Sequence, residues 1–480
     1  MKRTLILAFC TFSTCFALAQ SGYRIAVTVK PYRNQYVYLG YYLGKLKALA
    51  DSALLDANST GMFSGKQKLP GGIYFVVSPG KQLLFEVLVD KQQQFSITAD
   101  TADLSGRLTF SGSEDNAQFQ SYSKFISLRG QEMNDLQGRL KKAGSRADSL
   151  QISDRLKVLN KQVQDYREDT EEKYPSSLLS TLFRSMKEPA VPAVENHPGR
   201  VYDSLFAYRY YKSNYWNGIS FTDERLLRTP IFEPRLEKYY KELVPPDPDS
   251  IKSEIDMMLL KAAGNNEMYK YLLTHFVQKY INPEYMGQDA VFVHLFERYI
   301  NNNPKVDWFT EKYKKFMFER AYSLMANLIG QPASNLQMVD TSGKLTALYS
   351  VKAPFTIICF WDPTCSHCKE VVPKLDSIFK AKWKKQGIKL YGVMVDGGRK
   401  AWVQYISENK LADWIHVYET AVQKDAGYAA GRPSYKQLYD VYQTPVLYLL
   451  DKDKRIIAKK LSYQQIDEVI SLKSKNVKLN

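Results

Sequence analysis

Two cysteines, Cys365 and Cys368, are the residues whose type and spacing point most directly to chemistry. In disulfide exchange, one thiolate attacks a disulfide, and a second thiolate attacks the mixed disulfide that forms. A C-x-x-C pair can also be half of a zinc site. Beyond residue 20 the sequence has no second cysteine pair and no histidine pair at ligand spacing, so we favour disulfide exchange.

The residues around the pair predict a strand, a short turn and a helix. Phe355–Trp361 is a nearly continuous apolar run, rich in aromatic and β-branched residues, which is typical of a strand buried on both faces. Asp362–Thr364 interrupts this run. Apolar residues then recur at helical spacing from Val371 to Phe379, so both cysteines fall in the first turn of the predicted helix.

The start of that helix is expected to activate Cys365. The first N–H groups of a helix have no intrahelical acceptor, and the helix dipole places partial positive charge there, so a thiolate is stabilised. His367 and Lys369 add positive charge close by in the sequence. We therefore expect the pKa of Cys365 to lie below its ordinary value of about 8.5, with Cys365 attacking and Cys368 resolving.

Two further motifs accompany the pair. Ile329–Val351 begins IGQPA and continues into DTSGK, and Thr444-Pro445 stands directly before the predicted strand Val446–Leu450. With these motifs, residues 328–480 resemble the exported thioredoxin-like reductases of the TlpA/ResA type. The resemblance implies an α/β thioredoxin fold and a cis Pro445 that leaves the backbone of Thr444 free to pair with an extended substrate.

The same resemblance implies the partners of the site. Protein thiols or disulfides would be the substrates, and another envelope redox protein would supply electrons. No nucleotide or metal motif is present, so no dissociable cofactor is expected beyond the redox-active Cys365–Cys368 disulfide.

Three positions depart from the family pattern. Thr364 replaces the usual Trp before the first cysteine, Val371 replaces a Glu that assists proton transfer in relatives, and Glu370 is one residue early. His367 stands where the oxidising C-P-H-C motif has its histidine, so we expect it to tune the thiolate. The direction of electron flow stays open. We expect a reduction potential above that of thioredoxin, whose potential is about −270 mV.

The N-terminus predicts export. Residues 1–19 combine Lys2 and Arg3, an apolar run and an A-x-A cleavage site, which is typical of a signal peptide. An uncleaved anchor, or a lipoprotein modified at Cys10 or Cys15, is the alternative. We expect a protein of the periplasm or cell envelope with no transmembrane span in the mature chain. Cleavage leaves Cys359 as the one cysteine beside the pair, and it is expected to be a small core residue.

The balance of charge does not point to nucleic acid. The net charge is +16, and it falls to +14 when the leader takes Lys2 and Arg3 with it. The basic residues are spread along the chain, so we interpret them as a solvated surface, with weak attraction to acidic envelope polymers as the alternative.

Two more domains are expected before the thioredoxin-like one. Residues 20–114 predict a small antiparallel β-sandwich-like domain, which resembles the β domain of unknown function that precedes thioredoxin domains in exported Bacteroidota proteins. Residues 115–327 predict a helical domain. It includes a hairpin across Gly144-Ser145 and a helix capped by Asp249-Ser250.

Other candidate residues in the helical domain have simpler structural interpretations. His197, His275 and His294 are isolated, and the tyrosine-rich stretch Tyr208–Trp216 is interpreted as helix packing rather than a sugar or peptide site. The function we favour is an envelope thiol–disulfide oxidoreductase. The alternative is a non-enzymatic envelope binding or assembly protein that uses the thioredoxin fold as a scaffold.

Overall fold

The computed structural model describes residues 22–477, which divide into two compact units. One unit holds the chain up to Leu243 together with Lys261–Met268, and the other holds Val244–Leu260 and the chain from Tyr269 onward. The predicted leader, residues 1–19, lies outside the described residues. The predicted domain boundaries stay a prediction.

The first unit begins with a β sandwich. One sheet has the order β4-β1-β7-β8, and the other has the order β3-β2-β5-β6. The strands are β1 (Tyr23–Lys30), β2 (Tyr36–Leu43), β3 (Leu46–Leu54), β4 (Thr60–Gly65), β5 (Gly72–Val77), β6 (Leu83–Val89), β7 (Gln94–Asp100) and β8 (Thr109–Ser111). Buried side chains of both sheets, among them Ile25, Val37 and Val76, form one core. The predicted antiparallel domain is confirmed, but β1 and β7 pair in parallel.

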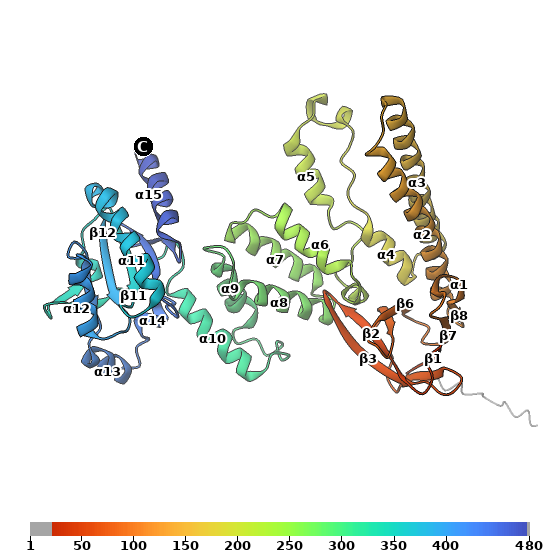
Figure 1. Ribbon diagram of the computed structural model, residues 1–480, viewed down its shortest axis with the longest axis horizontal. Helices are drawn as coiled ribbons and strands as arrows, with labels where there is room; N and C mark the ends of the chain where they lie inside the picture. The colour runs from red at the N-terminus through yellow and green to blue at the C-terminus, as the bar shows by residue number, and fades with distance from the viewer. Residues whose placement is uncertain (1–21, 478–480) are drawn as a thin grey trace, which may run out of the picture. The chain divides into compact units, whose positions relative to one another are not determined.

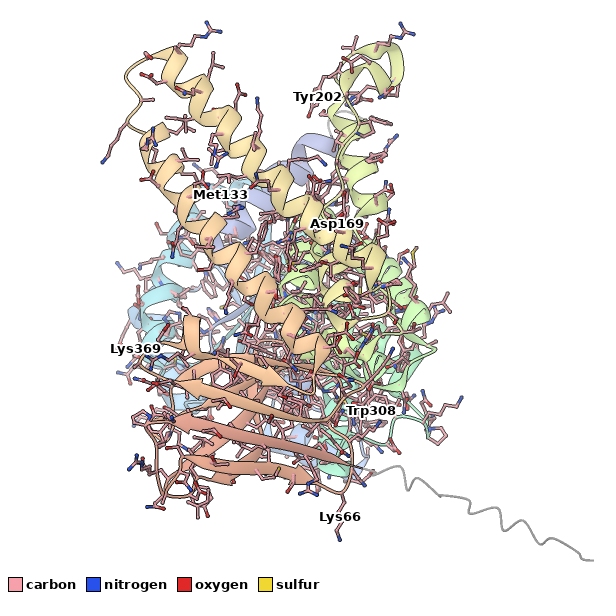
Figure 2. All side chains as sticks on the ribbon, turned by 90° about the vertical axis from the view of Figure 1, so that its right-hand side faces the viewer. Lys66, Met133, Asp169, Tyr202, Trp308 and Lys369 are labelled. Carbon is pink, nitrogen blue, oxygen red and sulfur yellow. The ribbon has the colours of Figure 1, made fainter. Side chains whose placement is uncertain are left out.

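A long helical hairpin follows the sandwich. It consists of α2 (Glu114–Leu140) and α3 (Arg146–Lys173), which lie side by side (Figures 1 and 2). Leu136, Ile152 and Leu159 are buried between them, with Met133, labelled in Figure 2, packed against this cluster. The hairpin predicted across Gly144-Ser145 is confirmed, with Ser145 capping α3.

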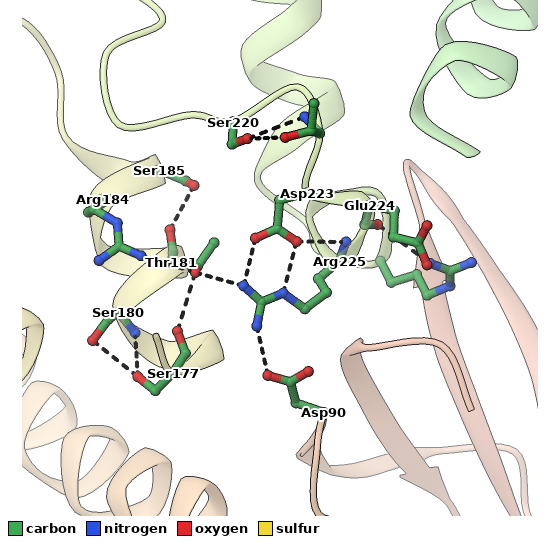
Figure 3. A network of polar contacts seen from close by, with 12 residues as sticks. Asp90, Ser177, Ser180, Thr181, Arg184, Ser185, Ser220, Asp223, Glu224 and Arg225 are labelled. Carbon is green, nitrogen blue, oxygen red and sulfur yellow. Dashed lines mark hydrogen bonds and ion pairs between the residues drawn. The ribbon is translucent and has the colours of Figure 1, made fainter. Parts of the chain in front are cut away.

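An arginine network joins the sandwich to the next helices of the same unit (Figure 3). Arg225 lies in the 3-10 helix η3 (Glu224–Arg228) and binds Asp223 at 2.6 Å and Asp90, between β6 and β7, at 2.7 Å. It also donates to Thr181 Oγ1, in α4 (Leu178–Met186), at 3.1 Å. A Cβ at Gly71 would stand 2.8 Å from Arg225 Cγ, so glycine there lets the sandwich approach η3 closely.

The rest of this unit, and the start of the second, is helical. The elements are α1 (Leu104–Arg107), α5 (Ser204–Asn214), α6 (Phe232–Lys238), α7 (Pro248–Ala262), α8 (Asn266–Tyr280), α9 (Asp289–Leu295) and α10 (Glu311–Met325). One detail corrects the sequence prediction: Asp247, not Asp249-Ser250, accepts from the Ser250 N–H at 2.9 Å at the start of α7. Pro248 fits the first turn because it needs no hydrogen-bond acceptor there.

The C-terminal domain, residues 328–477, is an α/β sheet with the order β10-β9-β13-β12-β11-β14-β15. Its strands are β9 (Gln337–Asp340), β10 (Leu345–Ala347), β11 (Phe355–Trp361), β12 (Lys389–Met394), β13 (Ile415–Tyr418), β14 (Val446–Asp451) and β15 (Ile456–Lys459). The helices are α11 (Ser366–Ile378), α12 (Arg399–Glu408), α13 (Ala421–Ala429), α14 (Tyr435–Leu438) and α15 (Tyr463–Val477). β11 is parallel to β12 and antiparallel to β14, and it is almost wholly buried, as predicted.

The sequence predicts an irregular Ala/Gly-containing segment after the short strand Trp414–Tyr418 and a helix over Tyr435–Tyr442, and the structure differs in both places. Residues 421–429 form a helix rather than an irregular segment; α13 buries no side chain, so it has no apolar stripe to reveal it. The helix predicted over Tyr435–Tyr442 ends at Leu438, because Asp440 has a left-handed backbone, with φ of 51°.

Buried polar side chains fasten the second unit together. Lys459 of β15 is ion-paired with Asp289 of α9, and it donates to the Asn327 side-chain oxygen at 2.6 Å. Burial lowers the pKa of Lys459, and the charge of Asp289 opposes that shift. No helix of the part described here is long and apolar enough to cross a membrane.

Candidate active site

The turn between β11 and α11 presents Cys365 at the helix start. Asp362 Oδ1 accepts hydrogen bonds from the N–H and hydroxyl of Thr364, both at 2.7 Å, and the Cys365 N–H donates to the Asp362 carbonyl at 3.3 Å. Cys365 is the N-cap residue of α11, with extended backbone, so the free N–H groups of the first turn surround its sulfur.

The Cys365 sulfur is the activated one. It is partly exposed, and its pKa is lowered by hydrogen bonds, first from the backbone N–H of Cys368 and then from Thr444. The backbone N–H of His367 also contributes. The Cys365 thiol, when protonated, lies 3.6 Å from the Thr444 carbonyl oxygen. That carbonyl favours the protonated thiol, so the backbone N–H groups at the helix start are what stabilise the Cys365 thiolate.

The Cys368 sulfur has the opposite environment. Its side chain is buried, and burial raises its pKa to about 11, although the Asp362 N–H donates to the sulfur at 3.5 Å. Cys359 lies fully buried in the middle of β11, where burial raises its pKa well above the ordinary value. Cys359 therefore packs as a core residue, as expected, and offers no accessible thiol.

The remaining predicted site residues meet at the same place. Thr444-Pro445 precedes β14, and its peptide bond is cis. His367 and Pro445 both line a cavity of about 920 Å³ beside the pair. The His367 side chain is exposed, and Glu370 binds Lys374 at 2.9 Å rather than approaching the sulfurs. Val371, in place of the acid that assists relatives, contributes an apolar wall.

The other candidates of the sequence lie in structural contacts. His294 pairs with Asp256 at 2.8 Å, His197 Nε2 lies 3.1 Å from the Pro192 carbonyl, and His275 stacks on Tyr271. In the tyrosine-rich stretch, the buried Tyr215 donates to the Arg235 carbonyl at 3.0 Å. Within residues 22–477, no group of three or more His, Cys, Asp or Glu residues could hold a metal ion.

One part of the site is not apparent from the sequence. Phe316, Glu319 and Arg320, all on α10, line the same cavity as His367 and Pro445. Nothing in the local sequence of α10 marks these residues, because their place beside the cysteine pair depends on contacts with residues about 120 positions later.

Two regions of the chain match known family models. The thioredoxin-like family model matches residues 355–456, which include both cysteines. A family described as a domain of unknown function, DUF5106, matches residues 158–326. The C-terminal domain is therefore thioredoxin-like, and a DUF5106 segment precedes it. Neither matched range reaches the β sandwich.

Several solved structures resemble the chain. A domain of a possible thiol-disulfide isomerase from Cytophaga hutchinsonii is 35% identical, with 32% of this chain and 97% of that chain covered and a TM-score of 0.28. A thioredoxin-like protein from Bacteroides caccae is 21% identical over 60% of this chain and 98% of that one, with a TM-score of 0.44. The thioredoxin domain of a thiol-disulfide oxidoreductase from Bacteroides vulgatus is 25% identical over 29% and 96%, with a TM-score of 0.25. No curated protein matches the chain significantly.

Proposed function

We propose that the protein is an exported thiol–disulfide oxidoreductase that acts on protein thiols and disulfides through Cys365 and Cys368. The observation that supports this most strongly is the contrast between the two sulfurs. Cys365 is partly exposed with a lowered pKa, and Cys368 is buried with a raised one. Such a pair has one ready nucleophile and one protected thiol. The proposal of export to the periplasm or cell envelope rests on the leader at residues 1–19.

In the reducing direction, the Cys365 thiolate attacks one sulfur of a substrate disulfide. A Cys365–substrate disulfide forms as the substrate bond breaks, and the other substrate sulfur leaves as a thiolate and takes up a proton. Cys368 then loses its proton and attacks the Cys365 sulfur, so the second substrate thiol is released and the Cys365–Cys368 disulfide forms. Two electrons pass to the substrate, and an envelope dithiol protein returns them.

The raised pKa of Cys368 slows the second step, because only the thiolate attacks. At neutral pH the Cys368 thiol is almost wholly protonated, because its pKa is about 11. Val371 replaces the acid that would help to remove this proton in relatives. The proposal therefore includes a mixed disulfide that persists long enough to be captured. The cis Thr444-Pro445 loop would hold its substrate segment through backbone pairing.

Trapping of mixed disulfides tests the assignment of roles. Cys368→Ser leaves Cys365 able to attack but removes the resolving thiol, so mixed disulfides with envelope proteins should accumulate on non-reducing gels. Cys365→Ser should trap none. Equal trapping by the two variants would show that the roles are assigned wrongly.

Alkylation and insulin reduction separate this function from the non-enzymatic alternative. Because its pKa is lowered, Cys365 should react with iodoacetamide at pH 7 faster than a free thiol, and Cys368→Ser should keep that rate. The wild type should accelerate insulin reduction by dithiothreitol. If it does not, and Cys365 reacts no faster than a free thiol, the chain uses its thioredoxin fold as a binding scaffold.

A further inference from the structure

The cavity beside the cysteine pair has walls from two regions of the chain. His367 and Val371 of α11 form one side, and Pro445 lies at the base, where β14 begins. The opposite side comes from α10, through Phe316 and Glu319. α10 lies in the segment that matches the domain of unknown function, and it is next to the C-terminal domain in Figure 1.

α10 is fixed to the loop that carries the cis-proline. Arg320 is ion-paired with Asp440, whose side chain is fully buried and which also binds Lys460. One turn further along α10, the Ser323 hydroxyl donates to the Gln437 carbonyl at 2.6 Å. Just beyond the end of α10, the Asn327 side chain donates to the Leu438 carbonyl at 3.0 Å. A buried carboxylate is costly unless its partners stay in place. These contacts therefore hold α10 at a fixed position relative to Pro445.

The charged side chains that line the cavity do not favour a ligand of either charge. Among the described residues that line the cavity, three are acidic (Glu319, Glu370 and Asp440), and three besides His367 are basic (Arg320, Lys374 and Lys460). Glu370 is paired with Lys374, and Asp440 with Arg320 and Lys460. A charged side chain entering this cavity would gain little net attraction, and it would lose part of its hydration.

Apolar surface is what the cavity offers instead. Phe316 is 45% exposed and Tyr442 is 75% exposed, and both line the cavity. Val371 and Leu461 add aliphatic surface. Large apolar side chains exposed together at the edge of a cavity are typical of a surface that a partner covers.

We propose that α10 is a specificity wall of the substrate site, which selects protein segments with an apolar side chain close to the reacting cysteine. The segment lies extended beside Thr444-Pro445, and that apolar side chain packs against Phe316. This proposal rests on the oxidoreductase function, because the occupant is the substrate whose sulfur Cys365 attacks. Phe316 is thus a specificity-determining residue supplied by the domain of unknown function.

The chain provides a matched control for a test. Phe318 is on the same helix and is 46% exposed, but it does not line the cavity. The probes are short peptides whose cysteine is joined to thionitrobenzoate by a disulfide, so that attack by the reduced protein releases coloured thiol. One peptide has Leu two residues from the cysteine, and a second has Glu there. The aromatic disulfide reagent without a peptide is the third probe.

Phe316→Ala should raise KM for the leucine peptide by about tenfold, because apolar contact is lost, and kcat should stay unchanged. Phe318→Ala should change neither constant. Both variants should react with the peptide-free reagent and with iodoacetamide at the wild-type rate, which shows that the fold and Cys365 are intact. The wild type should have a lower KM for the leucine peptide than for the glutamate peptide.

Three results would overturn the proposal. In the first, Phe316→Ala behaves like Phe318→Ala towards the leucine peptide. In the second, Phe316→Ala is equally slow with the peptide-free reagent, which places its effect on the cysteines rather than on peptide binding. In the third, the wild type reacts with no probe, which refutes the oxidoreductase function and this proposal with it.

Discussion

Two arginines hold the central helices to different neighbours, and they do so in different ways. Arg225 joins η3 to the sandwich through Asp90, and its own side chain is 20% exposed. Arg320 joins α10 to the C-terminal domain through Asp440, whose side chain is fully buried. Residues 158–326, the range that matches the domain of unknown function, are divided between the two compact units. That range is therefore not one independent body, and only its second part is built together with the cysteine pair.

The electrostatics of the two networks differ as well. The pKa of Arg225 is raised, first by its hydrogen bond to Asp223, and partial burial opposes this. Burial by itself would raise the pKa of Asp440, but its hydrogen bond with Lys460 and the charges of Lys460 and Arg320 hold it below the ordinary value. If Arg320 or Lys460 is removed, the buried Asp440 carboxylate loses a partner that water cannot replace. If a partner of Arg225 is removed, the guanidinium group is still partly hydrated.

The largest effect is expected when the buried network is broken. Asp440→Ala leaves Arg320 without its buried partner and should lower the free energy of unfolding by about 3–5 kcal/mol. It should also raise KM for the leucine peptide, because α10 and the cis-proline loop lose their connection. Denaturant unfolding and the peptide assay measure the two effects. Asp440→Asn keeps the shape and part of the hydrogen bonding, so its free energy of unfolding should lie between that of Asp440→Ala and that of the wild type. If Asp440→Ala lowered the free energy of unfolding by less than about 1 kcal/mol, the Arg320–Asp440 ion pair would not be important for stability.

A smaller and purely structural effect is expected in the other unit. Arg225→Ala removes the hydrogen bonds to Asp90, Asp223 and Thr181 and should cost about 2–3 kcal/mol of stability. Alkylation of Cys365 and reduction of the peptides should keep wild-type rates. Arg225→Lys should recover only part of the stability, because lysine cannot make the two-nitrogen contact. A changed rate at Cys365 would contradict the separation of the two regions.

The smallest effect concerns the reduction potential. His367→Ala should lower the potential by some tens of millivolts, because the imidazole beside the thiolate is removed; about 30 mV corresponds to 1.4 kcal/mol. The exposed position of the imidazole, and the presence of the His367 backbone N–H among the donors to Cys365, keep this effect small. A redox titration against glutathione compares the variant with the wild type. Identical potentials would assign the stabilisation of the thiolate to the backbone and helix alone.

What the sequence could predict depended on how deeply each segment is buried. β11 was predicted residue for residue, because a strand covered on both faces is apolar throughout. The sequence pattern does not indicate β3 as a strand, because three of its leucines, Leu46, Leu49 and Leu54, face solvent. The positions of the two cysteines at the start of a helix followed from the same strand and turn. The cysteine pair could therefore be placed from the sequence alone.

The α10 side of the site could not be predicted from the sequence. Phe316 and Phe318 are the same residue type, two positions apart and almost equally exposed, yet only Phe316 lines the cavity. The difference is set by Arg320 and its partner Asp440, which are separated by 120 positions in sequence. Hydrophobic periodicity along one helix carries no information about a contact of that range.

The buried Lys459 limits how this chain could be recombined. Its partners, Asp289 and the side chain of Asn327, both precede residue 328, where the C-terminal domain begins. A gene fusion that joined residues 328–480 to another leader would keep both cysteines, but it would remove the polar partners of Lys459 and the α10 side of the cavity. The compact unit that holds the cysteine pair is therefore longer than the thioredoxin-like domain: it includes most of α7–α10, whereas the sandwich belongs to the other unit.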